Sequence, residues 1–82
     1  MTKLEVITLI KKKLIEIIPE FEEEEIDVTE SLVDIGANSI DRGELIMLTL
    51  EALELEVSRI EFVGAQTIDE LADLMLHHRA KE

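Results

Sequence analysis

Apolar residues recur every three or four positions through the first 18 residues, which is the spacing of one face of an α-helix. Thr2 followed three positions later by Glu5 is a capping box, in which each side chain binds a free backbone N–H at the helix start. Pro19 disfavours helical backbone at Ile18, so the helix should end there. The face expected to be buried carries Leu4, Ile7, Ile10, Leu14, Ile17 and Ile18.

Residues 19–38 show no comparable period and predict a long connection, a type of loop that is often functional. The acidic run Glu22–Glu25 is better interpreted as a solvated turn than as a metal site, because the spacing and central glycine of a calcium loop are missing. Scattered apolar residues should pin the connection to the core, and these are Phe21, Ile26, Val28, Leu32, Val33 and Ile35.

The longest apolar-patterned stretch runs from Ser39 to about Leu55 and predicts a second long helix. A second capping box, Ser58 with Glu61, should open a short helix that Gly64 closes.

A third capping box, Thr67 with Glu70, should open the last long helix. His77 and His78 point about 100° apart on that helix, which makes them a poor pair of metal ligands. We therefore expect residues 1–82 to form one domain with an all-α, four-helix bundle fold: three long helices, one short helix and a long first loop.

The composition excludes several functions. Twenty Asp and Glu against eight Lys and Arg give a net charge of −12, which repels nucleic acid and anionic membranes and favours basic protein surfaces. The chain has no cysteine, so it offers no thiolate nucleophile and no disulfide. Neither a signal peptide nor an apolar run of the ~20 residues that span a bilayer is present, which favours a cytoplasmic protein.

Ser39 lies where the long connection gives way to the second long helix. A serine there is usually a helix cap. The residue three positions later is Arg42, however, which is wrong for a capping box, whereas Asn38 is followed three positions later by Asp41. Asn38 can therefore cap the helix, which leaves the Ser39 hydroxyl turned outward and open to approach.

An exposed Ser39 is a poor candidate for a catalytic nucleophile. Such a serine needs a base within hydrogen-bond reach, and the only histidines lie near the far terminus. No acid–base pair with a pocket can be assembled in so short a chain, so we do not expect an enzyme. Ser39 is better suited to modification by another enzyme.

The helix that follows carries two kinds of surface. At 100° per residue, a core stripe holds Leu45, Ile46, Thr49 and Leu53. The other side mixes acids with large apolar residues: Asp41, Glu44, Glu51 and Glu54 with Ile40, Met47, Leu48 and Leu55. Such a mixture is typical of a transient docking surface, on which charge steers and apolar side chains anchor the partner. The alternative is a helix buried on two sides.

The stretch LVDIGANSIDRGELIMLTLEAL resembles the acyl carrier protein family, in which a glycine, a short residue and Asp or Asn precede the modified serine and an aliphatic residue. Here these positions are Gly36, Ala37, Asn38, Ser39 and Ile40, and the resemblance covers essentially the whole chain. It implies a non-catalytic carrier with the bundle fold of that family. It also implies that Ser39 carries 4′-phosphopantetheine from coenzyme A, whose thiol holds acyl groups as thioesters.

Within the family, GANSIDRGE looks most like the free-standing carriers of polyketide β-branching in antibiotic biosynthesis. Their implied role is that of donor: malonyl is loaded, decarboxylated to acetyl and passed to a hydroxymethylglutaryl-synthase-like enzyme. Acceptor carriers typically show a Trp six residues after the serine, where this chain has Leu45. Asn38 in place of the usual Asp, and the cation at Arg42, depart from most fatty-acid carriers.

The resemblance implies four partners for a monomeric carrier: a phosphopantetheinyl transferase, an acyltransferase, a decarboxylating ketosynthase-like enzyme and the hydroxymethylglutaryl-synthase-like enzyme. The residues expected to be read by partners are Asn38, Ile40, Asp41, Arg42, Glu44, Met47, Leu48, Glu51 and Glu54. Two alternatives stay open, namely a general fatty-acid or aminoacyl carrier and, in a different class, an acidic helical interaction protein.

Overall fold

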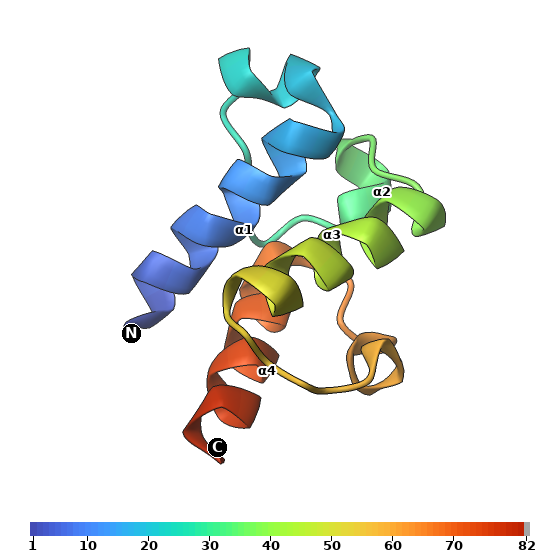
Figure 1. Ribbon diagram of the computed structural model, residues 1–82. Coiled ribbons are helices and arrows are strands. Elements are labelled where there is room, and N and C mark those ends of the chain that lie inside the picture. Colours follow the sequence, from blue (N-terminus) through green and yellow to red (C-terminus); the bar gives the residue numbers. More distant parts are fainter. Residues whose placement is uncertain (82) are drawn as a thin grey trace.

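The computed structural model describes residues 1–81 and consists of helices joined by loops. Its long helices are α1 (Lys3–Ile17), α3 (Ser39–Ala52) and α4 (Ile68–Ala80), and α1 packs against both of the others (Figure 1). The predicted short helix is η2 (Arg59–Phe62), a 3₁₀ helix. The all-α prediction with three long helices and one short helix is confirmed.

The long first loop has more structure than its sequence pattern indicates. It contains the 3₁₀ helix η1 (Pro19–Glu23) and the single turn α2 (Leu32–Ile35). Phe21 is buried, and the loop is tied to the start of α4 because the Leu32 N–H donates to the Gln66 carbonyl at 2.8 Å. The loop is pinned as predicted, except that Val33 is 59% exposed.

The predicted capping boxes at the starts of α1 and α4 are present. Thr2 and Glu5 bind each other's backbone N–H groups at the start of α1, and Thr67 and Glu70 do the same at α4. These hydrogen bonds from Thr2 lower the pKa of the Glu5 carboxyl. The local side-chain pattern was therefore sufficient to predict where these helices begin.

The predicted box of Ser58 and Glu61 is wrong. The Ser58 hydroxyl accepts from the Ile60 N–H at 3.3 Å, and the Glu61 side chain does not reach back. The tighter winding of a 3₁₀ helix brings the N–H of its second residue, Ile60, to the Ser58 hydroxyl, and the Glu61 side chain is left exposed. The helix also ends at Phe62, with Val63 at its C-cap, before Gly64 is reached.

The core is formed by the facing sides of the three long helices, and the short helices η1, α2 and η2 add Phe21, Leu32 and Phe62. One predicted core residue is wrong: Leu4 is 72% exposed. Helix α1 carries two neighbouring apolar stripes, and α3 and α4 cover the one that runs through Val6, Ile10 and Leu14, all fully buried. Within residues 1–81, every helix is too short or too polar to cross a membrane.

Candidate functional site

The segment that delivers Ser39 begins where α2 stops. Gly36 has φ +115°, a left-handed conformation that glycine adopts without steric cost. The Gly36 N–H donates to the Val33 carbonyl at 3.1 Å and the Ala37 N–H to the Leu32 carbonyl at 2.8 Å, which is the hydrogen-bond pair of a Schellman motif. Ala37 is fully buried, so the chain is anchored immediately before it turns into α3.

Asn38 is the N-cap of α3, as predicted. Its side-chain oxygen accepts from the Asp41 N–H at 2.8 Å, and the Asp41 carboxylate accepts from the Asn38 N–H at 3.3 Å. Ser39 is the first residue of the helix and is exposed. Because the Asn38–Asp41 box closes the helix start, the Ser39 hydroxyl is not needed there.

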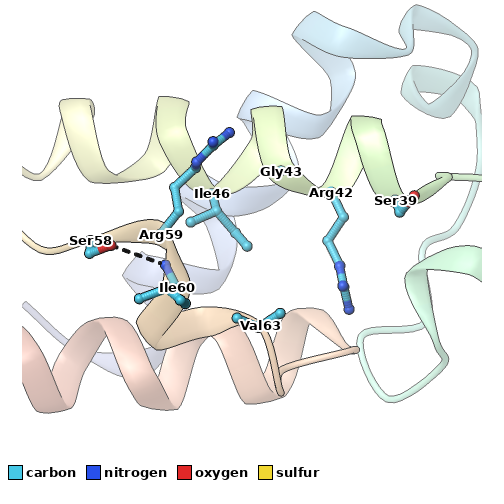
Figure 2. A pocket seen from close by; sticks show the side chains of 8 residues that line it. All are labelled: Ser39, Arg42, Gly43, Ile46, Ser58, Arg59, Ile60 and Val63. Carbon is cyan, nitrogen blue, oxygen red and sulfur yellow. Dashed lines mark hydrogen bonds between the residues drawn. The ribbon is translucent and has the colours of Figure 1, made fainter.

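Two cavities open on either side of Ser39. One is a groove of ≈440 Å³ between α3 and η2, and Figure 2 shows Ile46 of α3 facing Ile60 of η2 and Val63, the C-cap of η2, across it. The other, of ≈460 Å³, lies toward α2 and the segment before α4 and is lined by Ser31, Val33, Asp34, Ser39, Arg42 and Gln66. Ser39 and Arg42 are the two residues that both linings share.

Large apolar side chains are exposed around Ser39. On α3, Ile40 is 78% and Met47 43% exposed, while Leu48 is half-buried. The predicted acids Glu44 and Glu51 are exposed among them. The structure therefore places these residues of the predicted docking surface together on the outer side of α3, facing away from the buried stripe of Leu45, Ile46, Thr49 and Leu50.

Helix η2 and its C-cap add two exposed residues that the sequence analysis missed, Ile60 at 71% and Val63 at 54%. Their signal in the sequence was the pair of large apolar residues on either side of Phe62, which is itself buried. Because both residues line the groove that begins at Ser39, the exposed apolar surface spans η2 as well as α3.

Leu55 was wrongly placed on the outer surface, since it is only 6% exposed. Helix α3 ends at Ala52, and Glu54 takes a left-handed conformation with φ 56°. The Leu55 N–H then donates to the Leu50 carbonyl at 2.9 Å, which closes the helix as Gly36 closes α2 and turns Leu55 into the core. Glu54 stays exposed but lies beyond the helix face.

Two arginines border the groove. The Arg42 Nη1 donates to the Ala65 carbonyl at 3.2 Å, in the segment after η2. The Arg59 side chain extends from η2 across α3 at Gly43, and its Nη1 lies 3.4 Å from the Met47 sulfur (Figure 2). Neither arginine forms an ion pair with a carboxylate of residues 1–81.

The family profile described as "Phosphopantetheine attachment site" matches residues 8–75. The chain therefore belongs to the phosphopantetheine-dependent carrier proteins, and the predicted family is confirmed. It is a non-catalytic carrier, and its cofactor is phosphopantetheine.

Two relatives refine this membership. The "Polyketide biosynthesis acyl-carrier-protein AcpK" of Bacillus subtilis (strain 168) is 35% identical over 75 residues, which cover 92% of each chain. A chain in the "Crystal Structure of the Curacin Biosynthetic Pathway HMG Synthase in Complex with Acetyl Donor-ACP" is 45% identical, with a TM-score of 0.86 over 92% of this chain and 96% of that one. This chain is similar to both along nearly its whole length.

The residues around Ser39 fit a phosphopantetheine group. A phosphodiester needs an accessible hydroxyl, and Ser39 is exposed on a helix start that Asn38 caps. The adjoining groove has the volume of a small-molecule site and combines apolar residues with hydroxyl and guanidinium groups.

Proposed function

We propose that Ser39 is the attachment point and that this chain is the acetyl donor carrier of a polyketide β-branching system. The attachment is supported by the geometry: Ser39 is the exposed residue at a helix start whose capping is already provided by Asn38 and Asp41. When bound, the cofactor supplies a thiol that holds malonyl or acetyl as a thioester. The chain has no cysteine and therefore no thiol of its own.

The donor role is carried by one observation. The chain matches, at 45% identity and a TM-score of 0.86, a chain in the crystal structure of an HMG synthase in complex with an acetyl donor carrier. The likeness to a polyketide acyl carrier protein agrees with this role. Leu45 is also consistent with a donor, because it stands where acceptor carriers typically show Trp and is fully buried in the core.

In this role, the residues of the chain present the cargo and select the partner. Asn38 and Asp41 hold the first turn of α3 rigid, so the attachment point has a fixed direction. The acids of α3 steer a basic partner surface, while Ile40 and Met47 provide apolar contact next to the arm. Such an interface should be small and short-lived, because a carrier must leave one enzyme before it visits the next.

We further propose that residues 1–82 act as one carrier domain in the cytoplasm. Its partners there would be a phosphopantetheinyl transferase, an acyltransferase and a decarboxylating ketosynthase-like enzyme, in addition to the hydroxymethylglutaryl-synthase-like enzyme. The contiguous core shared by all three long helices supports the single domain.

Acetyl transfer tests the donor role. The acetyl-loaded protein and an acetyl-loaded fatty-acid carrier are presented separately to a hydroxymethylglutaryl-type synthase, and the acetylated synthase is measured by intact mass over time. The donor proposal predicts faster transfer from this protein at equal concentration. Equal rates from both carriers would leave a general acyl carrier and contradict the donor role.

A further inference from the structure

Arg42 occupies a special place relative to Ser39. The two residues are three positions apart on α3, which makes them neighbours on the helix surface. They are also the two residues that line both cavities beside the helix start. A group attached to the Ser39 hydroxyl that leans toward either cavity therefore passes Arg42.

The guanidinium of Arg42 has donors to spare. A guanidinium carries five N–H donors, and the structure assigns one contact to it, from Nη1 to the Ala65 carbonyl at 3.2 Å. The ion pairs among residues 1–81 join Lys3 to Asp69 and Asp73, and Lys13 to Glu16, but include no pair to Arg42. In a chain with twenty acids, this arginine is thus free to bind an anion.

The charges around Ser39 would otherwise oppose a phosphodiester. Asp41 belongs to the capping box of the same helix start, and Asp34 lines the cavity toward α2. A phosphodiester on Ser39 adds one more negative charge to a helix start that already has these acids nearby, in a chain whose net charge is −12. Arg42 is the basic residue that lines both cavities there.

We propose that Arg42 is a positioning residue that binds the phosphodiester formed on Ser39. This inference rests on the proposed attachment at Ser39. The planar fork of a guanidinium matches two phosphate oxygens, so Arg42 can bind the phosphate while Nη1 keeps its bond to Ala65. The contact neutralises the added charge and fixes the root of the arm at the junction of the two cavities. Arg42 therefore acts on the arm, in addition to any contact with a partner.

The test compares unmodified and modified protein. The wild type, Arg42→Gln and the matched control Arg59→Gln are loaded with excess transferase and coenzyme A, and loading is verified by intact mass. Arg59 lines the same groove but lies at Gly43, beyond the attachment point, so it should not contact the phosphate. The melting temperature of each protein is then measured before and after loading at low salt, and the Arg42 side-chain N–H signals of the wild type are followed by NMR.

We expect loading to lower the melting temperature by several degrees more in Arg42→Gln than in the other two proteins, with a difference that shrinks as salt is added. Subtracting the unmodified protein removes the effect of the lost Ala65 bond. The NMR signals of the Arg42 N–H groups should shift on loading of the wild type, and this measurement does not depend on any substitution. Equal temperature changes in all three proteins together with unmoved Arg42 signals would overturn this inference alone. A wild type that gains no mass would instead overturn the attachment and, with it, this inference.

Discussion

Replacing Asn38 by alanine should destabilise the protein, whereas the same replacement at the neighbouring Ser39 should not. The Asn38→Ala change removes the acceptor of the 2.8 Å bond from the Asp41 N–H and loosens the reciprocal 3.3 Å bond. Loss of an N-cap costs about 1 kcal/mol. In a domain of this size, that loss lowers the melting temperature by about 4–8 °C.

Ser39→Ala removes a hydroxyl that the capping box does not use and puts a better helix former inside α3. We therefore expect its unfolding free energy to stay within about 0.5 kcal/mol of the wild type. Asn38→Asp is the matched control, because it keeps an acceptor oxygen at the N-cap and should remain close to the wild type.

Urea unfolding followed by far-UV circular dichroism measures all four proteins, and an unchanged dependence on urea concentration would show that the same surface is exposed on unfolding. The reverse order of stabilities would refute the reasoning. If Ser39→Ala lost about 1 kcal/mol while Asn38→Ala lost nothing, Ser39 would be the structural cap and the argument for a freely available hydroxyl would fail.

Three further predictions concern charge and docking. Because Glu22–Glu25 are all exposed in a chain of net charge −12, added salt or millimolar magnesium should raise the melting temperature. A melting temperature that neither salt nor magnesium changes would show that repulsion between these carboxylates is negligible. The Thr2 N–H and hydroxyl hold the pKa of Glu5 below its ordinary value of 4.5, so Glu5→Gln should lower the free energy of unfolding at neutral pH. The difference in stability between Glu5→Gln and the wild type should vanish as the pH falls through the lowered pKa of Glu5. A difference that is independent of pH in urea titrations would contradict this. In stopped-flow binding to the synthase, Glu51→Lys should slow association and reduce its salt dependence, whereas Ile40→Ser should mainly speed dissociation. Identical effects of both changes would argue against a surface on which acids steer the partner and apolar residues anchor it.

The features predicted correctly from the sequence are those with local causes. The capping boxes at Thr2 and Thr67 depend on side chains three positions apart, so their signal lies within one turn of helix. Asn38 was predicted as the cap of α3 for the same reason. The local pattern around Ser39 was informative because it determines both the capping and the exposure of the serine.

The wrong predictions concern features that depend on packing between segments far apart in the sequence. Nothing local distinguishes the stripe of Val6 from that of Leu4 on α1, because packing against α3 and α4 selects which one is buried. The end of α3 was missed because the residue in the left-handed conformation there is Glu54, whereas this position is usually occupied by glycine. Leu55 was misplaced as a consequence. The groove between α3 and η2 could not be predicted, since it depends on how η2 lies against α3.

The most direct test of the central claim is the intact mass of the protein after incubation with coenzyme A and a phosphopantetheinyl transferase. The wild type should gain the mass of one phosphopantetheine group, and fragmentation should locate that mass on Ser39. Ser39→Ala, which should keep the same helical fold, should gain none. A mass increase in Ser39→Ala, or none in the wild type with a transferase that loads a control carrier, would contradict the claim that Ser39 holds the arm.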